Sequence, residues 1–155
     1  DSTGLGTTLV LSLLTDKFLI FGNIGDSSGF VLKNNKLHKV TKDHTLVNLL
    51  VEAGDITEEE AKNHPQRNVL MKALGASENV DMDIFEVESD VNTGYFILCS
   101  DGLTNMLTTE QIEKVLEEDL TIEERVKKLI RKSNARGGTD NISIAYLEIK
   151  SGCEQ

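Results

Sequence analysis

Three aspartates stand where apolar runs of this sequence stop. They are Asp26, Asp101 and Asp140, each at the end of a predicted strand and each flanked by small residues that leave room at the carboxylate oxygens. Because they are placed alike on their strands, we expect them to converge on one hard cation. Mg²⁺ or Mn²⁺ is the expected ion, since both prefer oxygen ligands. The spacing therefore predicts a divalent metal site.

Each aspartate also has an alternative structural role. Asp26 after a glycine is typical of a tight turn. Asp101 would also cap a turn over residues 102–106, although a carboxylate next to an apolar run needs a compensating partner. Asp140 follows two glycines, and a turn explains that pattern as well as a ligand role does. The three side chains taken together favour the metal site.

The elements that must position these side chains are mostly strands. Apolar and alternating patterns predict strands at residues 7–14, 18–24, 29–32, 36–40, 80–87, 94–99 and 142–149. Helical spacing predicts a helix at 45–53, and capping boxes predict three more, beginning after Thr57, Thr108 and Thr121, the last reaching about Asn134. Helices in the middle of the chain and before the last strand indicate an α+β fold.

Composition limits the classes of function. The chain has 155 residues, enough for one domain with one core, and a formal net charge of −10. This acidic balance repels nucleic acid and anionic membranes, so neither is an expected partner. No apolar stretch approaches the roughly 20 residues that span a bilayer. Two cysteines, Cys99 in an apolar run and Cys153 in a polar tail, make no disulfide framework, which favours a cytoplasmic location.

Other kinds of site find little support. The three histidines, His38, His44 and His64, lack the spacing of zinc ligands, and His44 is predicted to be a surface loop residue. The glycines at 4 and 6 are followed by a strand pattern and do not make a dinucleotide loop. No Gly-x-Ser-x-Gly nucleophile elbow is present.

Seven short segments in order resemble the PPM-type (type 2C) metal-dependent protein serine/threonine phosphatases, and the bacterial branch fits best. The match runs from about residue 4 to residue 149. The segments are Gly6-Thr7-Thr8, Asn23-Ile24-Gly25-Asp26-Ser27, Thr41-Lys42-Asp43-His44, His64-Pro65-Gln66-Arg67-Asn68, Ala73-Leu74-Gly75, Cys99-Ser100-Asp101-Gly102-Leu103 and Gly138-Thr139-Asp140-Asn141.

The resemblance implies a fold, a site and a reaction. The fold would be two stacked antiparallel β-sheets flanked by helices, with a flap-like segment at about 41–75. Asp101 and Asp140 match ligands of one of two bridged Mn²⁺ or Mg²⁺ ions, and Asp26 with Asp101 matches a third, weaker site. The implied reaction is in-line attack of metal-activated water on the phosphorus of a phosphoserine or phosphothreonine protein, without a phosphoenzyme.

The sequence also departs from the family pattern. That pattern includes an N-terminal portion with a phosphate-binding arginine, an acidic ligand and an Asp-Gly-Met-Gly-Gly-like segment, which we do not find in these 155 residues. Ser28 stands where an arginine is common in the family. Residues 1–155 therefore resemble the C-terminal two-thirds of a phosphatase domain.

Three expectations follow for the chain on its own. We expect weak metal binding, on the order of millimolar for so few carboxylates, and no phosphatase turnover. We also expect self-association through exposed sheet surface. The alternative to a phosphatase is a non-catalytic regulatory or metal-binding remnant of the same fold.

Overall fold

The computed structural model describes residues 5–89 and 93–149. Cys153, predicted to lie in a polar tail, falls outside the described residues. The strands are β1 (Leu9–Leu14), β2 (Phe18–Ile24), β3 (Ser28–Lys33), β4 (Lys36–Lys39), β5 (Asp83–Glu88), β6 (Thr93–Cys99) and β7 (Ile144–Glu148). The helices are α1 (Leu46–Ala53), α2 (Glu58–Lys62), α3 (Asp101–Thr104), α4 (Thr109–Leu116) and α5 (Ile122–Ala135).

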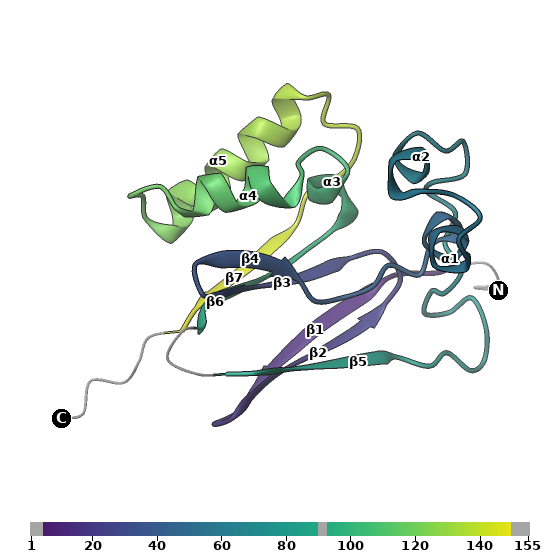
Figure 1. Cartoon of the computed structure of the whole chain (residues 1–155), viewed down its shortest axis with the longest axis horizontal. Helices are drawn as coiled ribbons and strands as arrows, with labels where there is room; N and C mark the ends of the chain where they lie inside the picture. Colours follow the sequence, from purple (N-terminus) through teal and green to yellow (C-terminus); the bar gives the residue numbers. More distant parts are fainter. Residues whose placement is uncertain (1–4, 90–92, 150–155) are drawn as a thin grey trace.

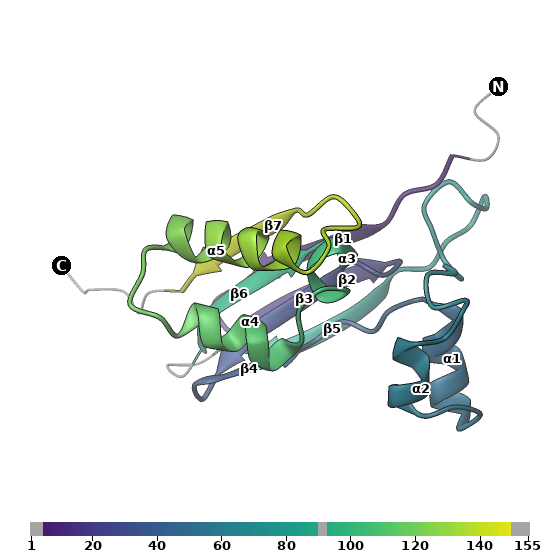
Figure 2. The same ribbon diagram turned by 90° about the horizontal axis from the view of Figure 1, so that it is seen from above.

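These elements form three layers, which Figure 1 shows from the side. A three-stranded sheet, ordered β1-β2-β5, lies under a four-stranded sheet, ordered β4-β3-β6-β7, and all the strand pairs are antiparallel. Helices α4 and α5 lie over the outer face of the four-stranded sheet, as Figure 2 shows from above. The prediction of an α+β fold with stacked antiparallel sheets flanked by helices is confirmed.

Two hydrophobic cores hold the layers together. Between the sheets, the rings of Phe21 and Phe96 meet edge to face with centroids 6.1 Å apart. Between the four-stranded sheet and the helices, Ile97 packs in one cluster with Leu103 and Leu129, all three fully buried. Burying a side chain of this size stabilises the fold by about 1.5–3 kcal/mol, so these cores hold the two sheets and the helices against one another.

Local sequence signals account for most element boundaries. Asn34 and Asn35 both have positive φ, the conformation that a tight two-residue hairpin turn requires. The capping boxes predicted at Thr57, Thr108 and Thr121 are all formed. Tertiary contacts shift some of the other boundaries. For example, β5 is predicted to begin at residue 80 but begins at Asp83, where its pairing with β2 starts.

The segment 41–75, which contains α1 and α2, lies beyond one end of both sheets (Figure 1). It is attached there by backbone hydrogen bonds, from His44 N–H to the Gly25 carbonyl at 2.9 Å and from Thr7 N–H to the Leu74 carbonyl at 3.0 Å. The outer face of the three-stranded sheet lies on the side of the molecule opposite α4 and α5 (Figure 1), and Leu13 and Ile84 are more than half exposed there. In residues 5–89 and 93–149 we find no helix that is long and apolar enough to cross a membrane.

Candidate functional site

Strand pairing brings the three aspartates to one end of the four-stranded sheet. Ser28 on β3 is the register partner of Cys99 on β6. Asp26 lies two residues before Ser28 and Asp101 lies two residues after Cys99, so antiparallel register places them side by side. Cys99 is in turn paired with Ile144 on β7, which follows Asp140 closely. The predicted convergence of the aspartates thus follows from the topology.

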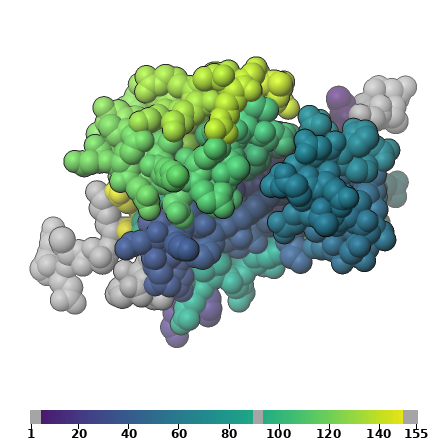
Figure 3. Space-filling model, turned by 45° about the horizontal axis from the view of Figure 1, so that its top comes forward, coloured from purple at the N-terminus to yellow at the C-terminus, as the bar shows by residue number. Residues whose placement is uncertain are grey.

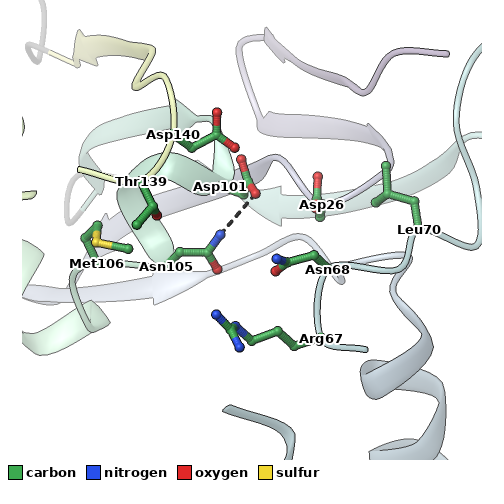
Figure 4. Close-up of a pocket in the computed structure, with 9 residues that line it drawn as sticks. All are labelled: Asp26, Arg67, Asn68, Leu70, Asp101, Asn105, Met106, Thr139 and Asp140. Atoms are coloured by element: carbon green, nitrogen blue, oxygen red, sulfur yellow. Dashed lines mark hydrogen bonds between the residues drawn. The ribbon is translucent and has the colours of Figure 1, made fainter. Parts of the chain in front are cut away.

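The aspartates line one cavity of about 490 Å³. Figure 4 shows Asp101 between Asp26 and Asp140, with Arg67 and Asn68 reaching in from the segment 41–75. The surface is hollowed here between that segment, in dark teal, and the helical layer, in green (Figure 3). The other lining residues are Leu70, Asn105, Met106 and Thr139.

Asp101 and Asp140 come from loops that are tied to each other. Ser100 N–H donates to the Ser143 carbonyl at 3.0 Å, and the Ser100 hydroxyl donates to the Asn141 carbonyl at 3.1 Å. Ser143 N–H donates back to Ser100 Oγ at 3.0 Å. Next to these hydrogen bonds, a Cβ on Gly102 would lie 2.3 Å from the Asn141 carbonyl oxygen. Only glycine therefore allows the two loops to approach each other this closely.

The turn that carries Asp26 is fixed independently. Gly25 has φ of +103°, and a Cβ there would lie 2.4 Å from a Thr8 methyl carbon. The hydroxyls of Thr8 and Ser27 are hydrogen-bonded at 2.9 Å. The N–H of Gly25 donates to Nδ1 of His44 at 3.0 Å. His44 is buried, so its prediction as a surface loop residue is wrong. The reason is that its ring bonds the Gly25 backbone, a partner that is distant in sequence.

Asp140 and Asp101 also make the local hydrogen bonds that the alternative turn and cap roles predict. Asp140 Oδ1 accepts from the Asn141 N–H at 2.7 Å, as in a turn. Asp101 begins the four-residue helix α3, and its Oδ2 accepts from Asn105 Nδ2 at 3.0 Å. Each of these bonds uses one oxygen of the carboxylate. The local roles therefore orient the side chains without excluding a ligand role.

The site concentrates negative charge in a partly buried place. Burial, and next to it the charge of Asp101, raises the pKa of Asp26 to about 6. Burial, and next to it the charge of Asp140, raises the pKa of Asp101, while the hydrogen bond from Asn105 opposes that rise. Repelling carboxylates of this kind are stabilised by a bound cation. The donor set of oxygens fits Mg²⁺ or Mn²⁺.

The arrangement differs from one cation shared by all three aspartates. Within the part of the chain that the structure describes, no group of three His, Cys, Asp or Glu side chains is placed to hold a single ion. Two pairs of carboxylates interact electrostatically, Asp26 with Asp101 and Asp101 with Asp140. This pairing is compatible with neighbouring ions.

The raised pKa of Asp26 predicts how the stability of the metal-free chain depends on pH. Between its ordinary value of 3.8 and about 6, the folded chain holds a proton on Asp26 that the unfolded chain has lost. This contribution to stability is present at low pH and is lost as pH rises through about 6. Urea unfolding should therefore give a lower free energy of unfolding at about pH 7 than at about pH 5.

Asp26→Asn is the control for this measurement. The variant should show a smaller loss of stability between the two pH values than the unmodified chain. Saturating Mn²⁺ should offset the loss in the unmodified chain, because the cation favours the ionised carboxylate. An identical pH dependence in the two proteins would remove Asp26 as its source.

Four polar residues of the cavity were not singled out from the sequence as site residues. They are Arg67, Asn68, Asn105 and Thr139. Arg67 and Asn68 belong to a turn that only the packing of the segment 41–75 brings to the cavity. Asn105 lies one helical turn after Asp101, and that i, i+4 spacing was the signal that could have found it.

Comparison with known proteins gives one consistent result. The family model described as protein phosphatase 2C matches residues 1–142. The serine/threonine phosphatase stp of Listeria welshimeri is 40% identical over 148 residues, which are 96% of this chain and 58% of the Listeria protein. The chain therefore spans less than two thirds of the length of this relative.

Solved structures agree with the sequence comparison. The serine/threonine phosphatase Stp1 from Staphylococcus aureus has a TM-score of 0.89 at 35% identity, covering 96% of this chain and 58% of that one. The catalytic domain of the serine threonine protein phosphatase PstP, in complex with 2 manganese ions, has a TM-score of 0.81 at 33% identity. That match covers 96% of this chain and 61% of the PstP chain.

Proposed function

Because this chain belongs to the protein phosphatase 2C family, we propose that it is the metal-binding part of a metal-dependent protein serine/threonine phosphatase. The observation that carries the proposal is the cavity in which Asp26, Asp101 and Asp140 face Arg67. The substrates proposed are phosphoserine and phosphothreonine proteins, the class named for the Listeria and Staphylococcus relatives. The segment 41–75 is proposed as the flap beside the site.

Each residue of the cavity has a proposed task. Asp101 and Asp140 would hold one Mn²⁺ or Mg²⁺ ion, and Asp26 with Asp101 would hold a neighbouring one. Such an ion supplies Lewis-acid stabilisation of phosphoryl charge and acidifies water. Asn105 holds Asp101 in orientation through its amide. Arg67 would bind phosphoryl oxygens, since a guanidinium makes paired hydrogen bonds to them.

A chimera tests the proposal directly. It joins the part of the Listeria protein outside the 148 matched residues to this chain, and the assay is release of phosphate from a phosphothreonine peptide with Mn²⁺. We expect turnover that Asp101→Asn abolishes. A folded chimera that binds Mn²⁺ without turnover would support the alternative, a non-catalytic metal-binding or regulatory remnant.

The chain on its own is expected to be inactive. The described carboxylates offer two ligands for each proposed ion, and efficient phosphoryl transfer requires charge neutralisation from several positioned groups. The purified 155-residue chain should show no Mn²⁺-dependent hydrolysis of p-nitrophenyl phosphate. The active chimera is the positive control, and turnover by the chain alone would contradict the expectation.

Self-association of the chain is a further prediction. The outer face of the three-stranded sheet carries Leu11, Leu13 and Ile84, which are 37%, 56% and 57% exposed. Its edge strands β1 and β5 can pair with another copy. We expect a dimer or larger species by light scattering, reduced by Leu13→Lys and unchanged by the exposed control His38→Asn on β4. A monomer at high concentration would contradict this.

The proposed location is the cytoplasm. It is supported by Cys99, a free and buried cysteine whose pKa is raised to about 12 by burial. A thiol of this kind suits a reducing compartment. With a net charge of −10, neither nucleic acid nor an anionic membrane is proposed as a partner.

A further inference from the structure

His44 makes an unusual set of contacts for a residue in a charged stretch of sequence. It is buried, and its backbone N–H donates to the Gly25 carbonyl at 2.9 Å. Its ring Nδ1 accepts from the Gly25 N–H at 3.0 Å. Its own carbonyl accepts from the Met71 N–H at 2.7 Å. His44 thus binds both the turn before Asp26 and the part of the segment 41–75 that contains Met71.

The hydrogen bonds define the form of the imidazole. Because Nδ1 accepts from a backbone N–H, it carries no proton, and the ring proton is on Nε2. Nε2 lies 3.0 Å from Oδ2 of Asp83, although its N–H does not point directly at that oxygen. The Asp83 carboxylate is also paired with Lys72 at 3.0 Å. The contact with His44, followed by that with Lys72, lowers the pKa of Asp83.

These contacts determine the direction of the Gly25 peptide groups. Both the N–H and the carbonyl of Gly25 are bonded by His44, and the carbonyl also accepts from Asn23 Nδ2 at 3.2 Å. A glycine at φ of +103° has little intrinsic preference to hold such a conformation. The bonds from His44 therefore fix the backbone from which the Asp26 carboxylate enters the cavity.

We propose that His44 is a positioning residue that couples the packing of the segment 41–75 to the direction of the Asp26 carboxylate. The neutral ring holds Gly25 on one side, and on the other side the ring and the carbonyl of His44 hold Asp83 and Met71. Metal affinity at Asp26 then depends on the acceptor at Nδ1. This inference rests on the proposed metal site and adds a residue that touches no ligand.

Two substitutions separate the two ring nitrogens. In His44→Asn the amide oxygen takes the place of Nδ1, so the bond from Gly25 N–H is kept and the contact with Asp83 is lost. In His44→Gln the amide nitrogen reaches the place of Nε2, so the contact with Asp83 is kept and the Gly25 N–H loses its partner. If His44 were only structural, the loss of Mn²⁺ affinity in both variants would follow their loss of folding stability.

The experiment measures Mn²⁺ affinity by electron paramagnetic resonance of the free ion, and amide hydrogen exchange at Gly25 without metal. We expect His44→Gln to weaken Mn²⁺ binding about ten-fold or more, the usual effect of losing an outer-shell partner, and to speed exchange at Gly25. His44→Asn should remain within about three-fold of the unmodified chain, and His38→Asn, on exposed β4, should be unchanged.

The outcomes are distinguishable. Equal Mn²⁺ affinity in His44→Gln and the unmodified chain overturns the positioning role, as does an equal loss in both variants that parallels their melting temperatures. If the unmodified chain binds no Mn²⁺, the proposed metal site fails instead. Exchange at Gly25 then still decides on His44, because protection should persist in His44→Asn and disappear in His44→Gln.

Discussion

Replacement of Asp101 by Asn is expected to weaken Mn²⁺ binding by at least about ten-fold without unfolding the protein. Asp101 lies between Asp26 and Asp140 in the cavity and belongs to both proposed ligand pairs (Figure 4). Removing its charge therefore weakens both proposed ions. Isothermal titration with Mn²⁺ measures the change.

The same substitution should not lower the stability of the metal-free chain. Burial and the neighbouring charge of Asp140 raise the pKa of Asp101, so its ionised form is held at a cost that asparagine does not carry. The hydrogen bond from Asn105 becomes weaker, because an amide oxygen accepts less strongly than a carboxylate, and this offsets part of the gain. Asp16→Asn, exposed in the turn between β1 and β2, is the matched control. Weakened Mn²⁺ binding in that control, or unchanged binding in Asp101→Asn, would contradict the assignment.

Gly102→Ala is expected to destabilise the fold by about 1–3 kcal/mol and to weaken Mn²⁺ binding as well. The added Cβ would lie 2.3 Å from the Asn141 carbonyl oxygen, which is backbone and cannot rotate away. Alanine gains up to about 1 kcal/mol of helix propensity over glycine. The cost of the overlap exceeds this gain, so the net change in folding stability is a loss. Relief of the overlap moves the Asn141 loop, and with it Asp140, away from Asp101.

Gly6→Ala is the control for that substitution. A Cβ at Gly6 would lie 3.5 Å from its nearest neighbours, an ordinary contact, so its stability should change little. Urea unfolding of both variants and Mn²⁺ titration test the pair. If Gly102→Ala were as stable as the unmodified chain with unchanged affinity, the close approach of the two loops would not hold Asp101 and Asp140 together.

Much of the fold is readable from local sequence because its causes are local. The strand 18–24 is found where its apolar content, after the turn at residues 15–17, places it. The three capping boxes form because each threonine and its acid or amide are three residues apart. Burial along α5 is less predictable: Leu129 is fully buried, whereas Ile122 at the helix start is 38% exposed. Which residues are covered depends on the sheet beneath.

The site divides in the same way. The sequence alone determined which residues bear the carboxylates, since Asp26, Asp101 and Asp140 stand at strand ends and resemble family motifs. It did not determine the environment of those carboxylates. The contribution of Arg67 depends on how the segment 41–75 packs, and His44 is misassigned from sequence because its partner Gly25 is nineteen residues away.

Residue type and spacing set the chemistry that this chain carries and which stretches form strands, because both depend on neighbours within a few positions. The tertiary structure decided which strand ends meet, which oxygens are buried together and which backbone groups hold them. Those outcomes depend on the register between strands that are distant in sequence, on close contacts such as that of Gly102 with Asn141, and on the desolvation that raises the pKa of Asp26.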